Sequence, residues 1–161
     1  MNIRPETKAD IQAIFDLTKV AFAPVEYSDG SEVQIIDDLR KAGDLMLSLV
    51  MDDDGVVGHV AFSPVILNCP GRWAGLGPIA VEPNRQRQGI GTALVADGIA
   101  QLAAMDFDGC VLVGNPAVYG PMGFSSGGLT YHDLPSELVM GRSITGLVPT
   151  GFITYAPAFD V

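Results

Sequence analysis

The chain of 161 residues is poor in cysteine, histidine and positive charge, and each shortage excludes a class of protein. Two cysteines, Cys69 and Cys110, are too few for a disulfide framework and form no Cys-x-x-Cys pair. The two histidines have no carboxylate cluster at ligand spacing, so we expect no metal site. Nine basic residues against nineteen acidic ones give a net charge of -10, which repels nucleic acid and anionic membranes.

Long hydrophobic runs are also missing. The uncharged apolar stretch at residues 56–68 is interrupted by His59, Ser63 and Pro64 and is too short to span a bilayer. The first ten residues lack the apolar segment of a secretory signal, so we expect a soluble, cytoplasmic protein. Hydrophobic residues make up 48% of the chain, which is enough for a packed core, and the length suits a single domain over residues 1–161.

Hydrophobic periodicity predicts a mixed sheet covered by helices. Thr7 with Asp10 and Ser31 with Gln34 have the spacing of capping boxes, and each predicts a helix that follows, the second ending at Gly43. A third helix is predicted from residue 90 to about 108, and a short helical segment around residue 119. Strands are predicted at residues 2–4, 45–51, 56–63, 73–81, 110–113, 137–144 and 150–156.

A strand, a turn and a helix start meet in residues 77–92, which read GPIAVEPNRQRQGIGT. Gly89 and Gly91 leave room for a ligand to approach the backbone closely. The N–H groups of about residues 87–92 are expected to point out of the helix N-terminus, where the macrodipole also attracts anions. This arrangement predicts a cradle for a pyrophosphate group.

Two arginines beside the turn would add positive charge, Arg87 in a charge-assisted contact and Arg85 in a weaker, more solvated one. A solvated surface loop is the alternative, because runs of charge usually lie on the surface. A Rossmann fingerprint fits poorly, since Leu94 stands where its third glycine is needed. The Gly-Lys-Ser/Thr of a Walker motif is absent.

A second motif, Tyr119-Gly-Pro-Met-Gly-Phe124, follows the predicted strand at residues 110–113. Together with Val81-Glu-Pro83 at the strand end and Gln86 to Gly91 in the turn, it resembles the GNAT superfamily of N-acetyltransferases over the whole chain. The resemblance implies an α/β (α+β) fold with a GNAT-type mixed, mostly antiparallel central sheet. Helices would lie on both faces, and the sheet would splay at the acetyl-CoA site.

The resemblance also implies acetyl-CoA (coenzyme A) as cosubstrate. The pantetheine arm would pair like an extra strand with the backbone around Ile79, and a main-chain N–H near Val81 would polarise the thioester carbonyl. Tyr119 matches the family tyrosine that protonates the departing thiolate. The implied cofactor contacts are Ile79, Ala80, Val81, Gln86, Arg87, Gln88, Gly89, Ile90, Gly91, Thr92, Asn115 and Tyr119.

Two departures from the family pattern affect the catalytic roles. Asn115 lies four residues before Tyr119 instead of seven, so it contacts the cofactor differently or caps the short helix. The strand at residues 74–81 contains no carboxylate, although many members hold a general base there.

Candidates for the base, and for contacts to the acceptor, are Glu26, Glu32 and His59. Each has a structural or solvated alternative, and for His59 a hydrogen-bonded histidine within the sheet is the default interpretation.

These observations predict transfer of an acetyl group from acetyl-CoA to a primary amine, by direct attack in a ternary complex. The acceptor would be a small molecule or a peptide bound near residues 26–32; no nucleic-acid or membrane partner is expected, and a homodimer stays open. One alternative is a CoA-binding regulatory module that has lost catalysis, which the missing strand carboxylate favours. Another is a nucleotide-binding domain for an unrelated ligand.

Overall fold

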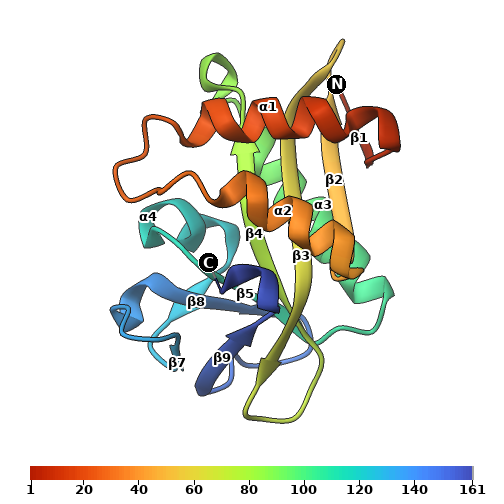
Figure 1. Ribbon diagram of the computed structural model, residues 1–161. Helices are drawn as coiled ribbons and strands as arrows, with labels where there is room; N and C mark the ends of the chain where they lie inside the picture. Colours follow the sequence, from red (N-terminus) through yellow and green to blue (C-terminus); the bar gives the residue numbers. More distant parts are fainter. Residues whose placement is uncertain (161) are drawn as a thin grey trace.

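In this computed structural model, which describes residues 1–160, the strands form a sheet with helices on both faces (Figure 1). Within these residues, no helix is both long and apolar enough to cross a membrane. The helices are α1 (Ile11–Phe22), α2 (Glu32–Ala42), α3 (Ile90–Ala104) and α4 (Pro116–Tyr119). The strands are β1 (Asn2–Pro5), β2 (Leu47–Asp52), β3 (Val56–Leu67), β4 (Trp73–Val81), β5 (Gly109–Val113), β6 (Ser125–Ser126), β7 (Leu129–Thr130), β8 (Val139–Ser143) and β9 (Gly151–Tyr155).

Hydrogen bonding joins the strands in the order β1-β2-β3-β4-β5-β8-β6, and β9 pairs with the end of β3 and with β7. The pairs are antiparallel except for β4 with β5 and β7 with β9. The predicted mixed, mostly antiparallel sheet is therefore confirmed.

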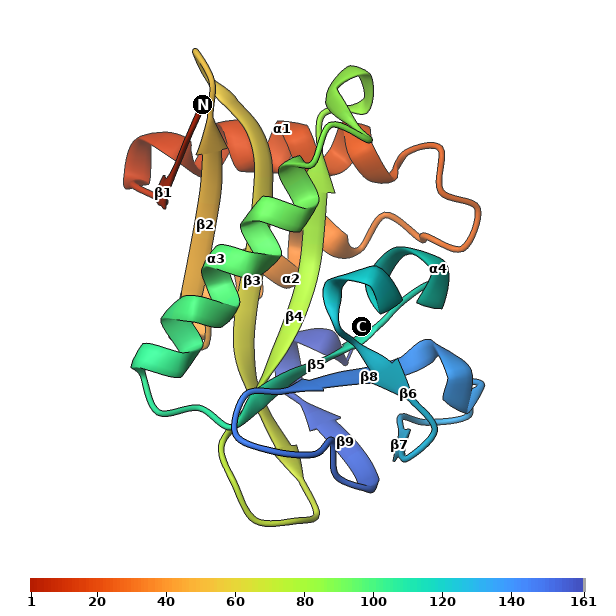
Figure 2. The ribbon, with the colours of Figure 1, turned by 180° about the vertical axis from the view of Figure 1, so that it is seen from behind.

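Helices α1 and α2 cover one face of the sheet, and α3 crosses the other, as the view from behind shows (Figure 2). The capping box predicted at Thr7 is present. The one predicted at Ser31 is wrong: its side chain caps nothing, and Ser28 instead donates a hydrogen bond to Glu32 Oε1 at 2.5 Å. Helix α2 ends as expected, with Gly43 in the left-handed conformation at φ 77°.

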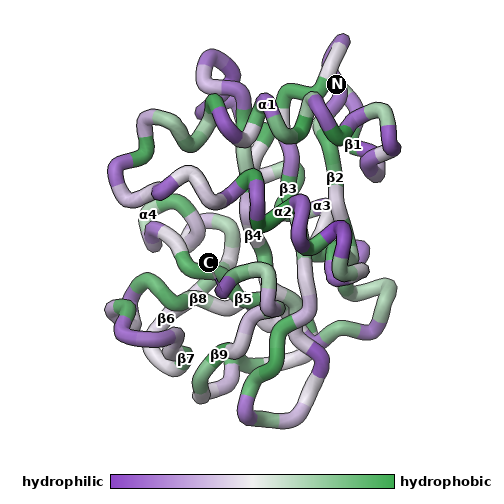
Figure 3. The backbone as a smooth tube through the Cα atoms, in the orientation of Figure 1, coloured by the Kyte–Doolittle hydropathy of each residue, from purple (hydrophilic) through white to green (hydrophobic). Residues whose placement is uncertain are grey.

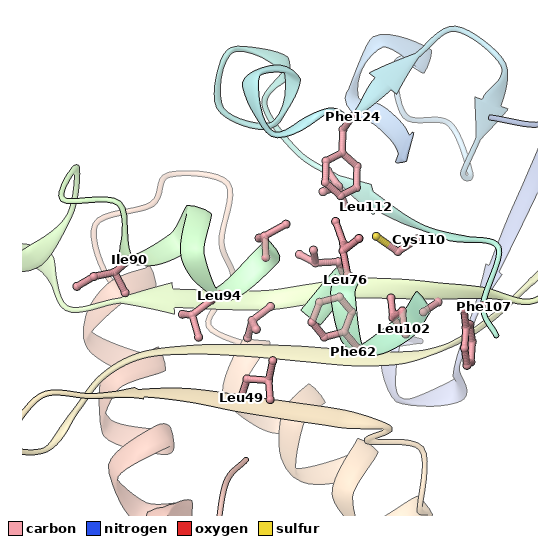
Figure 4. Packing of buried hydrophobic residues seen from close by; sticks show 14 of the residues in the cluster. Leu49, Phe62, Leu76, Ile90, Leu94, Leu102, Phe107, Cys110, Leu112 and Phe124 are labelled. Carbon is pink, nitrogen blue, oxygen red and sulfur yellow. The ribbon is translucent and has the colours of Figure 1, made fainter. Parts of the chain in front are cut away.

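The main core lies between the sheet and α3, with Phe62 of β3 fully buried beneath the helix (Figure 4). A Cβ at Gly98 of α3 would collide with the Phe62 ring, so glycine permits the close approach of helix and sheet. Leu94 and Leu102, also on α3, are fully buried in the same cluster. This packing holds α3 against the sheet.

Some boundaries differ from the predicted ones. Strand β3 continues to Leu67, because Val65–Leu67 pair with β9 after the predicted end at residue 63. Helix α3 ends at Ala104 instead of about residue 108, and Asp106 then takes a left-handed conformation at φ 63°. Strands β6 and β7 are two residues each and were not predicted, because so short a segment shows no periodicity.

Candidate active site

The chain turns between the end of β4 and the start of α3, in residues 82–89, which we name the phosphate turn. Gly89 precedes the helix with φ 84°, and Arg87 also has a positive φ of 62°. A Cβ built at Gly89 would meet no atom within 4 Å, so the space at the helix start is open. Figure 3 shows the turn as hydrophilic at the upper end of the molecule.

The amide N–H groups at the start of α3 have no protein acceptor. Ala93 N–H donates to the carbonyl of Gly89 at 3.0 Å, and no hydrogen bond within residues 1–160 uses the amides of residues 87–92. Such amides at a helix N-terminus carry partial positive charge and bind anions readily. Their geometry therefore suits a pyrophosphate group.

Some side chains of the turn form hydrogen bonds or ion pairs within the protein, and others do not. Arg87 is exposed and belongs to no ion pair within residues 1–160. Arg85 is engaged elsewhere, because its Nη2 donates to Asp53 Oδ2 at 2.7 Å. Gln86 Nε2 donates to the carbonyl of Val81 at 3.2 Å, so this side chain fixes the turn to the end of β4. Of these side chains, Arg87 alone is placed to add charge to the cradle.

Strand β4 loses one of its two neighbours before it reaches the turn. It pairs with β5 only through Trp73–Gly75, whereas its pairing with β3 continues to Val81. The β3 register shifts between Val60 and Phe62, which marks a bulge in the middle of β4. Residues 76–81 therefore have a strand partner on one side only, and their other edge can accept an extended ligand.

The three residues predicted along the coenzyme arm lie on this half-paired segment. Ile79 and Val81 point toward α3, since a Cβ on Gly91 would lie 3.8 Å from Val81 Cγ2 and 3.9 Å from Ile79 Cδ1. Ala80 is buried on the other face against α1. Their side chains are thus occupied by packing, and their main-chain groups are what a ligand could pair with.

Tyr119 ends α4 and is half-buried. Its ring meets Phe124 edge-on, with centroids 6.2 Å apart. Burial raises the pKa of Tyr119 above its ordinary value, and the nearby phenol of Tyr27 adds to the shift. The hydroxyl group is therefore protonated at neutral pH and able to donate a proton.

Tyr27 was missed by sequence reasoning. It lies in the α1–α2 connection and is 92% exposed, and a single exposed tyrosine in a loop forms no pattern. Figures 1 and 2 both show that connection beside α4, so residues from distant parts of the chain border the same region.

Asn115 caps α4, because its side-chain oxygen accepts a hydrogen bond from Ala117 N–H at 2.9 Å. This is the capping role weighed from the sequence, and Pro116 follows at the first helical position. With that oxygen committed to the helix, a contact to the coenzyme would have to use the amide nitrogen.

The three candidates for a base lie in different surroundings. Glu26 is exposed, and Glu32 accepts the hydrogen bond from Ser28, both on the α1–α2 side. His59 is fully buried in β3, and its Nε2 lies 2.8 Å from Ser48 Oγ. Burial lowers the pKa of His59 to about 4. It is thus a buried histidine held within the sheet, on β3 opposite Ala80 of the half-paired segment.

Other features lie apart from these residues. Burial raises the pKa of Cys110 to about 12, so this thiol is not a nucleophile at neutral pH. A hollow of about 460 Å³ lies between β6, β8 and the segment after β8, and includes neither the phosphate turn nor Tyr119. Its lining is Gly123, Ser125, Ser126, Gly128, Ser143, Gly146, Leu147, Val148 and Pro149.

Known proteins share this arrangement of strand, turn and helix. A family model described as an acetyltransferase (GNAT) domain matches residues 2–127. The uncharacterized N-acetyltransferase YhbS of Escherichia coli (strain K12) is 36% identical over 137 residues, which cover 83% of this chain and 78% of that protein.

Two solved structures are similar over nearly the whole chain. A GNAT family acetyltransferase from Brucella melitensis, in complex with acetyl-CoA, is 40% identical with a TM-score of 0.86, covering 99% of this chain and 97% of that one. YhbS from Escherichia coli, in complex with CoA, is 30% identical with a TM-score of 0.88. The match covers 99% of this chain and 92% of that one. The chain therefore belongs to the GNAT acetyltransferase family and is an acyl-CoA-dependent transferase.

Proposed function

We propose that the protein transfers an acetyl group from acetyl-CoA to a primary amine by direct attack in a ternary complex. The observation that carries this proposal is the row of unpaired amides at residues 87–92, which follows the half-paired segment of β4 after the first residues of the phosphate turn. The similar structures with acetyl-CoA and CoA support the same donor.

The donor would lie with its pyrophosphate on these amides and on Arg87. Its pantetheine arm would pair with the open edge of β4 at residues 79–81, which brings the thioester toward the place where β4 and β5 separate. A main-chain N–H near Val81 would stabilise negative charge on the carbonyl oxygen during attack. The contribution of the chain is mainly to hold donor and acceptor together, which can itself supply several kcal/mol.

In the transfer step, the neutral amine attacks the thioester carbon, the new C–N bond forms and the C–S bond breaks. Tyr119 donates its phenolic proton to the departing thiolate, and the amine nitrogen gives up a proton to restore neutrality. That proton passes to water or to a carboxylate on the α1–α2 side, where Glu26 and Glu32 lie, and solvent returns a proton to the Tyr119 phenolate. His59 is not proposed as the base, since it is buried within the sheet.

Calorimetric titration with acetyl-CoA, with ATP and NAD as controls, tests the donor, and turnover on a panel of primary amines tests the transfer. We expect selective micromolar binding of acetyl-CoA, about -8 kcal/mol, and release of free CoA with at least one amine. Binding without any transfer would favour the CoA-binding module instead. Equal binding of ATP or NAD would contradict the donor site.

A further inference from the structure

The phosphate turn contains a residue whose backbone needs outside support. Arg87 has a φ of 62°, a left-handed conformation that costs a residue with a side chain on the order of 1 kcal/mol. Such a conformation persists only where surrounding structure fixes it. Residues 86–89 are exposed, so burial does not supply that support. Side-chain contacts of the preceding residues are the alternative source.

Arg85 Nε donates to Gln88 Oε1 at 3.4 Å within the turn, and two further contacts tie the turn to other parts of the chain. Gln86 holds the turn to the last carbonyl of β4, as described above. Arg85 reaches the β2–β3 turn, where its Nη2 donates to Asp53 Oδ2 at 2.7 Å, and the two side chains are 27% and 38% exposed. Figure 1 shows both turns at the same end of the sheet.

Asp53 is a firm anchor because its own turn is tightly bonded. Its N–H donates to the carbonyl of Gly55 at 2.9 Å, and the adjacent Asp52 accepts hydrogen bonds from Gly55 N–H and from Arg4 Nε, both at 3.1 Å. The hydrogen bond from Arg85 also holds the pKa of Asp53 below its ordinary value, so the carboxylate is charged at neutral pH. The β2–β3 turn thus offers a fixed negative partner to the phosphate turn.

We propose that Arg85 and Asp53 form a strap that pre-organises the phosphate turn for the pyrophosphate of CoA. Arg85 is then a positioning residue, and of the two arginines Arg87 alone contacts phosphate. This replaces the expectation of a weak contact between Arg85 and phosphate, because the Arg85 guanidinium is bonded to Asp53. The inference rests on the donor site proposed above. A turn already held in its binding conformation loses less entropy when the ligand arrives.

Calorimetric titration with CoA of Asp53→Asn, Arg85→Gln and Arg87→Gln tests the strap. Asp54→Asn is the matched control, since Asp54 is adjacent and belongs to no ion pair within residues 1–160. We expect Asp53→Asn and Arg85→Gln each to raise Kd about threefold, the size of a partly exposed ion pair. The control should bind as the wild type does, and the exchanged double variant Asp53→Arg/Arg85→Asp should recover most of the affinity.

The salt dependence of Kd separates positioning from direct contact. Loss of a cation that touches phosphate flattens the rise of Kd with salt, so Arg87→Gln should show a shallower slope. Arg85→Gln should keep the wild-type slope. The strap is overturned if Asp53→Asn binds CoA as well as or better than the wild type while Arg85→Gln binds worse, because freed Arg85 would then be a phosphate ligand. A wild-type protein that does not bind CoA would instead overturn the donor site itself.

Discussion

The donor half and the acceptor half of the proposed site are built in different ways. The donor half is one continuous segment, residues 79–92, and offers mainly main-chain groups at a strand edge and a helix start. The acceptor half, where the amine would attack and the thiolate would leave, combines side chains from the α1–α2 connection with Tyr119 of α4, far apart in the sequence. A site made of backbone depends on where glycines and helix starts fall, whereas a site made of side chains depends on how distant elements pack.

The largest effect should come from placing a side chain in the donor half. Gly89→Glu forces a residue with a side chain to φ 84° and puts a carboxylate among the amides that hold the pyrophosphate. We expect CoA affinity to fall about a thousandfold, about 4 kcal/mol, from backbone strain together with charge repulsion. Calorimetric titration measures this loss.

Gly43→Glu is the matched control for that variant. Gly43 ends α2 at φ 77°, and a Cβ there would also meet no atom within 4 Å, so the strain is the same but no anion site is near. It should lower stability slightly and leave CoA affinity intact. A Gly89→Glu protein that binds CoA normally would show that the pyrophosphate lies elsewhere.

The next largest effect concerns the acceptor half. Tyr119→Phe should lower kcat about a hundredfold while CoA affinity stays unchanged, because only the proton for the leaving thiolate is lost. Since burial raises the pKa of Tyr119 above 10.0, the wild-type rate should fall at high pH only above that value, and this fall should vanish in the variant. Tyr131→Phe, at another partly buried tyrosine, serves as the control. Unchanged turnover in Tyr119→Phe would remove the acid role.

The smallest expected effect concerns His59, which we expect to contribute to stability and not to the chemistry of the acceptor half. The folded protein keeps this histidine neutral until the pH nears 4, whereas the unfolded chain takes up the proton below about pH 6.5. Its contribution to stability is therefore complete above pH 6.5 and is lost as the pH falls, by about 2 kcal/mol at pH 5. Urea unfolding of the wild type and of His59→Gln at pH 7.5 and pH 5 measures the difference.

The His59→Gln variant should show a smaller loss of stability on acidification, because glutamine does not titrate. At pH 8 it should keep the wild-type kcat. A large fall in kcat with normal CoA affinity would place His59 in the chemistry after all.

Most of the fold was predictable because short stretches of sequence specify its helices and strands. The apolar spacing of α1 and α3, the capping box at Thr7 and the glycine at the end of α2 each depend on a few neighbouring residues. The full extension of β3 to Leu67 was not predictable, since its last residues pair with β9, more than eighty residues later. The cap at Ser31 is absent because Ser31 itself has a helical conformation, and the Gln34 side chain donates to Asp38 instead of reaching back to the helix start.

In the site too, features set by neighbouring residues were predictable, and features set by distant contacts were not. The positions of Gly89 and Gly91 marked the phosphate turn, and the half-paired edge of β4 agrees with it. The contact between Arg85 and Asp53 could not be predicted from the sequence. An aspartate is common in a tight turn such as the one at Asp53, so its presence did not indicate a distant partner. The approach of Tyr27 to Tyr119 has no sequence signature at all, since it depends on the path of the α1–α2 connection.

The central claim is that main-chain amides of one continuous segment hold the donor. The most direct test is a titration of the ¹⁵N-labelled protein with CoA, followed through the amide chemical shifts. We expect the largest changes at residues 87–92, with further changes at residues 79–81 and only small ones around the hollow at Ser125 and Ser143. Large changes at that hollow, with the amides of residues 87–92 unmoved, would contradict this claim.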